Sequence, residues 1–373
     1  MRRFRTVLII VASLPVLCPL AFASDSKASP FVFDADFDWI GLGGRIAYKG
    51  LNLSPYTDTV LSFTLGGAYD TYGYFRTPLD LPYDGTLQGY DNAKAPDVNR
   101  WTVRSGLEIV QGLLWNERDQ YNKLEMFLAW KSRYEKNVED SHTRQLLFDS
   151  NLPDRDQILQ NSVFLGLEWK DIDRRSPHRV LSGFGVEMSI EWGPEWMFNG
   201  QIGRADFARL NLSTRAFLPL FDLDPGATLN SLSAYMGFFL AFDYAAGNSI
   251  PLNVRETFGG WSPRKGLGYA VRGLEDCRFD APLKAVANWE VRLNLHAVAD
   301  PGLIPGLLYF VDCGYYNFIS TSYSGFVSST GGGIFLSLFD VFNLTFTTQF
   351  LLNQKRVTGG SWTPFFFTFI FHF

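Results

Sequence analysis

The sequence has few of the residue types that most often carry catalysis or bind metal ions. Its 373 residues include only four His and three Cys. The two Cys beyond the N-terminal segment, Cys277 and Cys313, are too few for a disulfide framework and have no metal-ligand spacing. No Ser has an evident His partner, and no phosphate-binding loop is found. We therefore expect no enzyme activity, no catalytic residue, no cofactor and no metal site.

The sequence also lacks a basic surplus and, beyond its first residues, a long apolar run. The formal net charge of -5 argues against nucleic acid as a partner, since a nucleic-acid surface needs excess positive charge. After residue 23 no window approaches the roughly 18 apolar residues of a membrane helix. The mean hydropathy of -0.02 suits a soluble protein. It also suits a transmembrane β-barrel, whose strands alternate apolar and polar residues.

The N-terminus is typical of an export signal. It begins with the basic residues Arg2, Arg3 and Arg5, which are followed by a short apolar stretch at 7–20. An A-x-A cleavage site follows at 21–23. The apolar stretch is too short for a comfortable membrane anchor. A lipoprotein site at Cys18 fits poorly, because the preceding residues do not match and Pro19 follows. We predict a signal peptide at 1–23 and one barrel domain at 24–373.

A period of two residues dominates the chain from about residue 38 onward. In 180–192, six apolar residues and Ser182 occupy every second position, the residues between them are mostly small or charged, and the run ends at Trp192. Such alternation places the two sets on opposite faces of a strand. A soluble β-sandwich with one wet face would also alternate. The strands are longer than soluble strands, however, and Trp and Tyr recur near their ends, which favours a membrane barrel.

The spacing of the strands predicts their number. Short links near residues 117 and 341 alternate with long ones at about 71–100, 136–156 and 246–281, as short periplasmic turns alternate with long external loops. Thirteen strand centres fall near residues 43, 64, 108, 128, 164, 186, 211, 238, 289, 312, 334, 348 and 368. A closed barrel of this kind needs an even number, so 31–34 supplies another. We predict an all-β fold: a single transmembrane antiparallel β-barrel of about 14 strands, with 12 to 16 fitting the pattern, and a long loop folded into its lumen.

One motif lies in the longest predicted loop, a second lies on the strands that follow it, and a third ends the chain. The loop carries Val271-Arg272-Gly273-Leu274, the next strand carries Glu290, and the following one carries Phe310-Val311-Asp312. By period-two parity, Glu290 and Asp312 point inward on adjacent strands. Two inward carboxylates favour a nearby cation, and the planar fork of an Arg pairs well with a carboxylate. The chain ends on alternating aromatics, among them Phe369, Phe371 and Phe373.

These motifs resemble those of the outer-membrane insertases and two-partner-secretion translocases, the Omp-eighty-five or bacterial surface antigen superfamily. There a long loop with a V-R-G-[FY] motif folds back into the lumen. Its Arg meets the Asp of an F-x-D motif on the second strand after the loop, and five strands follow the loop. The resemblance covers about 255–373 and is weaker before that. It implies a lock between Arg272 and Asp312 with Glu290 as a second acceptor, and a C-terminal assembly signal at Phe369, Phe371 and Phe373. Leu274 replaces the usual aromatic residue.

The resemblance implies an outer-membrane location and a role in outer-membrane protein or lipid assembly or translocation. Implied partners are outer-membrane lipid and the barrel-assembly machinery during biogenesis. Family members normally carry periplasmic capture domains before the barrel. Here only a short segment separates Ser24 from the first clear strand. A separate periplasmic partner chain is therefore one expectation. The alternative is a porin-like passive conduit that keeps the loop as a partial plug.

Overall fold

The computed structural model describes fourteen stretches of the chain and two single residues. These are residues 31–38, 41–49, 51, 53–73, 97–117, 121–138, 156–174, 181–223, 232–255, 271–274, 279, 281–295, 302–319, 323–338, 342–355 and 360–371. The predicted signal peptide, Cys277 and Phe373 lie outside these residues. Within the described residues, no helix is long and apolar enough to cross a membrane.

Fourteen antiparallel strands form one sheet in the order of the sequence. Each predicted strand centre lies inside one of them, and 31–34 lies in β1, so the predicted all-β fold and strand number are confirmed. The strands are β1 (Phe31–Asp38), β2 (Gly41–Tyr48), β3 (Thr59–Gly73), β4 (Asp97–Asn116), β5 (Tyr121–Val138), β6 (Gln157–Arg174), β7 (Leu181–Gly193), β8 (Asp206–Asp222), β9 (Ser233–Ser249), β10 (Leu283–Asn294), β11 (Leu303–Phe318), β12 (Tyr323–Leu338), β13 (Phe342–Leu351) and β14 (Trp362–Phe371).

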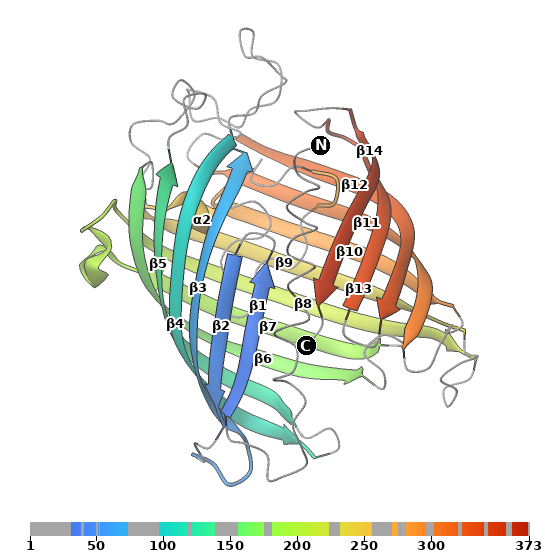
Figure 1. The fold of residues 1–373 in the computed structure, drawn as a ribbon, viewed down its shortest axis with the longest axis horizontal. Helices are drawn as coiled ribbons and strands as arrows, with labels where there is room; N and C mark the ends of the chain where they lie inside the picture. Colours follow the sequence, from blue (N-terminus) through green and yellow to red (C-terminus); the bar gives the residue numbers. More distant parts are fainter. Residues whose placement is uncertain are drawn as a thin grey trace.

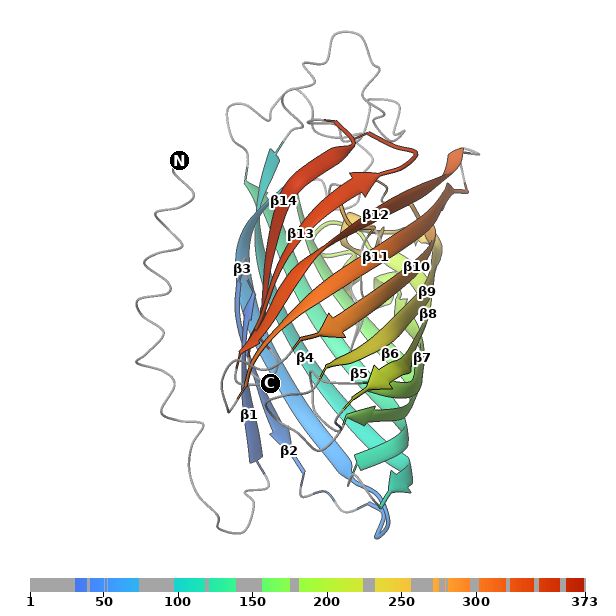
Figure 2. The ribbon, with the colours of Figure 1, turned by 90° about the vertical axis from the view of Figure 1, so that its right-hand side faces the viewer.

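The sheet curls into a barrel-shaped wall with strongly tilted strands (Figure 1). Figures 1 and 2 show that the wall brings β1 and β14 round to the same side of the molecule. Backbone pairing joins β1 to β2 and β14 to β13, and no pairing joins β1 to β14 among the described residues. Pro364 lies within β14 and has no N–H to donate, which sheets tolerate at an edge strand. The two end strands thus form a seam in the wall.

The two faces of the wall are inverted relative to a soluble protein. On β11, Leu307 and Tyr309 are 45% and 49% exposed, whereas Phe310 and Asp312, at positions of the opposite parity, are fully buried. The same pattern holds on β7, where Ile190 and Trp192 are exposed and Glu191 is buried. Apolar side chains therefore cover the outer face, and polar or charged ones lie on the inner face together with inward apolar side chains such as Phe310. This is the distribution of a transmembrane barrel.

Two short helical segments lie between strands. The segment α2 (Leu252–Arg255) follows β9, and η3 (Glu195–Asn199) joins β7 to β8. In η3 the backbone of Phe198 has a φ of 65°, a strained value for an aromatic residue. The buried side-chain amide of Asn199 bridges this turn to β6: its oxygen accepts from the backbone N–H of Asn161, and its nitrogen donates to the carbonyl of Asn161.

Candidate functional site: the lumen loop and its contacts

Between α2 and β10, the described residues 271–274 and 279 lie against the inner face of the wall. Val271 is fully buried in an apolar cluster formed by inward side chains of neighbouring strands. Phe279, from the same segment, stacks on Tyr316 of β11 with ring centroids 4.0 Å apart. Burial of these apolar side chains offsets part of the entropy cost of ordering a long loop. The described part of the loop around Val271, which we call the loop tip, is therefore packed inside the barrel.

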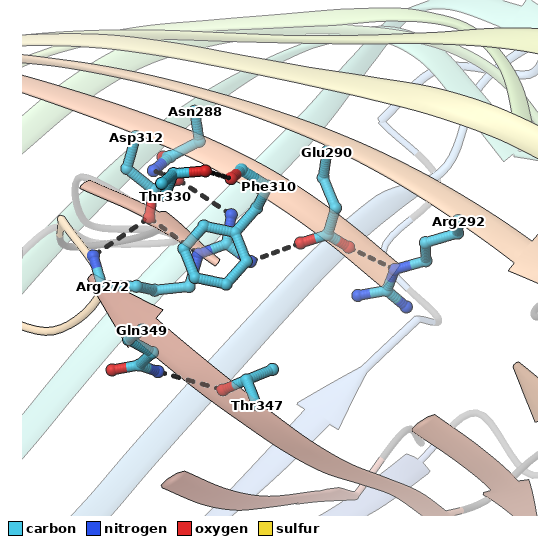
Figure 3. A network of polar contacts seen from close by, with 9 residues as sticks. All are labelled: Arg272, Asn288, Glu290, Arg292, Phe310, Asp312, Thr330, Thr347 and Gln349. Atoms are coloured by element: carbon cyan, nitrogen blue, oxygen red, sulfur yellow. Dashed lines mark hydrogen bonds and ion pairs between the residues drawn. The ribbon is translucent and has the colours of Figure 1, made fainter. Parts of the chain in front are cut away.

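Arg272 lies between the two carboxylates to which the sequence motifs assign it (Figure 3). Its Nε and Nη2 donate to Oδ2 and Oδ1 of Asp312, each at 2.8 Å, and its backbone N–H donates to Oδ2 at 3.0 Å. Its Nη1 donates to Oε2 of Glu290 at 2.5 Å. The guanidinium thus binds Asp312 bidentately and keeps another N–H for Glu290, which an ammonium group could not reproduce. We call Arg272, Glu290 and Asp312 the lumen lock.

Side chains of β10 and β11 hold the lumen lock in place (Figure 3). Asn288 donates to Oδ1 of Asp312 at 2.8 Å, and Arg292 forms an ion pair with Glu290. The guanidinium of Arg272 lies over the ring of Phe310, 3.6 Å from its centroid, in a cation–π contact. The F-x-D motif therefore presents both a ring and a carboxylate to Arg272 from the inner face of β11. The register pairs Asn288 with Asp312 and Glu290 with Phe310, which places all four residues together.

The glycine of the loop motif is needed for its turn. Gly273 has a φ of 89°, which L side chains rarely adopt, and a Cβ there would lie 3.3 Å from Cβ of Gln349. Leu274 donates its backbone N–H to the carbonyl of Val271 at 3.2 Å, and its side chain packs against the apolar cluster. A leucine thus occupies the position at which the family pattern has an aromatic residue, and it contributes apolar contact there.

The start of the same loop is held on the opposite part of the wall. The side-chain amide of Asn253 in α2 donates to Oε2 of Glu135 on β5 at 3.1 Å. Glu135 also pairs with Arg133 and with Arg100 at 3.3 Å. Val254 is fully buried with Ile158 and Phe207, from β6 and β8. We call Asn253, Val254 and Glu135 the α2 anchor. The sequence motifs did not identify it, although period-two parity on β5 places Glu135 inward.

Between the two contact regions, a chain of buried charges crosses the inner wall. Arg209 on β8 contacts Asp243 on β9 at 2.5 Å and Glu191 on β7 at 3.7 Å. Lys284 on β10 contacts Asp243 at 3.3 Å. All four side chains are at most 2% exposed. Side chains of opposite charge therefore link neighbouring strands on the inner face.

Some predicted residues lie where the structure gives no side-chain description. Phe369 and Phe371 are in the described backbone of β14, but their side chains are not described, and Phe373 lies outside the described residues. Cys313 is a free thiol on the outer face of β11, while Cys277 lies outside the described residues. Among the described residues, no group of three or more His, Cys, Asp or Glu side chains could hold a metal ion.

Comparison with solved structures identifies the fold. The structure resembles BamA from Haemophilus ducreyi lacking POTRA domains 1–3, with a TM-score of 0.54 and 12% identity over 90% of this chain and 63% of that chain. It also resembles CdiB from Acinetobacter baumannii, with a TM-score of 0.50 and 13% identity over 89% of this chain and 50% of that chain. This chain thus spans less than two thirds of either structure. No protein-family model and no curated protein matches the sequence. The fold is therefore the barrel fold of these two solved structures, in agreement with the fold that the sequence motifs predicted.

Proposed function

We propose that this chain is an integral bacterial outer-membrane barrel that acts in the assembly or translocation of outer-membrane protein or lipid. The observation that carries this proposal is the bidentate contact of Arg272 with Asp312 inside the wall. This contact holds a loop against two adjacent strands, at the positions that the family motifs predict. The sequence motif, the inward register and the barrel fold all agree at this contact.

The inverted faces support membrane insertion. Exposed Leu, Phe, Trp and Tyr side chains cover the outer face of successive strands, and the charges lie inside. Hydrocarbon accepts such a surface, and the strand ladder satisfies the backbone polar groups. The proposed partners are therefore outer-membrane lipid and, during biogenesis, the barrel-assembly machinery that reads the terminal strand. We further propose that a separate periplasmic chain captures the clients. We propose no catalytic activity for this chain.

The proposed working parts are the lumen lock and the seam between β1 and β14. Among the described residues no pairing joins β1 to β14, and the end strands of a sheet can pair with a strand of another chain. A client strand could therefore add to β14 or β1, while the held loop keeps the lumen from leaking. Insertion is tested with vesicles containing the chain, to which a urea-unfolded outer-membrane barrel is added. We expect faster appearance of the client's folded gel band than with empty vesicles. Equal rates in both vesicle preparations would contradict the proposal.

The second candidate function is a porin-like passive conduit partly plugged by its loop. The charged side chains that stay partly exposed on the inner face, Arg292 at 24% and Glu290 at 19%, are the observation that favours it. Single-channel recording in planar bilayers separates the two functions. Large, steady steps from the wild-type chain would favour the conduit. Small, flickering steps that become large in Arg272→Ala would favour a barrel kept closed by the lumen lock.

A further inference from the structure

The outer face of the wall has a hollow over β10. It measures about 370 Å³, within the range of small-ligand sites. Its floor consists of the small side chains Ala285, Ala287 and Cys313, which lie on the outer face of β10 and β11. The strand register pairs Ala287 with Cys313, so the floor is continuous across the two strands.

Large apolar side chains border this floor on both sides. Leu240 and Phe242 of β9 stand on one side, and Tyr315 of β11 and Phe326 of β12 stand on the other. The lining presents almost entirely carbon to the hollow. A polar or charged ligand would find little to bind there, because an unpaired polar group costs free energy in an apolar site. The hollow therefore suits a hydrocarbon chain.

We infer that this hollow is a binding site for one acyl chain of a membrane lipid. The inference rests on the proposed membrane location, since the hollow belongs to the outer face that would meet hydrocarbon. Lipid tails are as apolar as the wall, so transfer from water gives no preference for one site over another. Packing gives such a preference, because the side chains around an empty hollow lack dispersion contacts. An acyl chain lying in the hollow supplies those contacts. Elsewhere on the outer face, large side chains such as Leu165 and Ile190 project into the lipid.

The position of the hollow links it to the lumen lock. Ala287 is followed by Asn288, and Cys313 follows Asp312; Asn288 and Asp312 are bonded to each other on the inner face. An acyl chain in the hollow therefore lies on the opposite face of the sheet from the lumen lock. Occupancy would fix the β10 and β11 backbone that carries Asp312. The site is thus placed to stabilise the strands that hold the loop.

Photochemical labelling with a phospholipid that carries a diazirine in its acyl chain tests the site. The full chain is reconstituted in phosphatidylethanolamine and phosphatidylglycerol vesicles with a trace of this probe, irradiated, digested and mapped by mass spectrometry. We expect severalfold enrichment of label on the β10 and β11 peptides over those of β5 to β7. Filling the floor with the double substitution Ala285→Leu and Ala287→Leu should abolish this enrichment. The matched control Ala208→Leu, on the outer face of β8 away from the hollow, should preserve it.

Three outcomes overturn the inference, and they differ from failure of the proposed location. Even labelling around the wall, or enrichment that survives the filled floor, would mean that no acyl chain is bound preferentially. A disulfide-linked dimer through Cys313 in the same vesicles, with no enriched label, would mean that a second copy covers the hollow. Absence of label from every strand would instead refute membrane insertion itself.

Discussion

The two ends of the lumen loop are held by different physical means. The α2 anchor is buried: Val254 and Glu135 are 0% and 4% exposed, and the loop contributes an apolar side chain and one amide hydrogen bond. The lumen lock is charge-assisted, and Arg272 remains 19% exposed while binding two carboxylates. The packing at the α2 anchor depends on the shapes of the buried side chains. The lumen lock depends on the geometry of its charged groups. The start of the loop is therefore held mainly by packing, whereas the tip adds to its buried Val271 a charged contact that a single substitution can remove.

Glu135→Gln should have the largest effect, because it removes a buried charge that faces Arg133 and Arg100 as well as Asn253. Breaking a buried ion network by removing one partner typically costs about 3–5 kcal/mol. We expect a marked fall in the urea concentration at which the fast-migrating folded gel band is lost. Glu195→Gln is the control, since its pair with Arg204 is exposed and such pairs contribute little. Equal loss in both variants would contradict the distinction between wall and surface charges.

Arg272→Ala should release the loop tip and leave the wall folded. Hydrogen bonds to charged groups contribute about 1.5–3 kcal/mol, and the buried carboxylate of Asp312 would lose its bidentate partner. We expect faster proteolysis of the loop between α2 and residue 271, with an unchanged folded band. Asp312→Asn should behave similarly, and the double variant should be no worse than either single one. Summed defects in the double variant would mean that the two residues act separately.

Arg272→Lys should restore part of the contact. The ammonium can keep the charge attraction to Asp312, but it lacks the fork that reaches Asp312 bidentately while another N–H reaches Glu290. It should also weaken the contact with the ring of Phe310. Loop proteolysis and channel conductance of this variant should fall between those of wild type and Arg272→Ala. Full recovery by Lys would show that charge alone holds the loop tip.

The sequence predicts the lumen lock well and the α2 anchor poorly, and the reason is physical. Arg272 and Asp312 belong to short local motifs, and the period of two fixes which way Asp312 points. The number and positions of the strands follow from the same period. Asn253 has no such signal, because an isolated polar residue in a long loop reads as solvated. Its contact with Glu135 joins residues 118 positions apart and depends on how the whole wall curves. The strained turn at Phe198 is likewise set by the buried amide of Asn199 rather than by local propensity.

Asn253→Ala should have the smallest effect and gives the sharpest test of the difference between the two ends. It removes one hydrogen bond to a carboxylate that two guanidinium groups still contact, so we expect a loss of about 1 kcal/mol. Val254 stays buried in this variant and should keep the start of the loop on the wall. Proteolysis should therefore rise only slightly at α2. Since Asn253 donates to Glu135 whereas Arg272 donates to Asp312 and Glu290, the defects of the two substitutions should add in the double variant. A double variant that differs from that sum, as measured by the same proteolysis rates, would mean that the two ends are coupled, and the loop would then have to be treated as one cooperative unit.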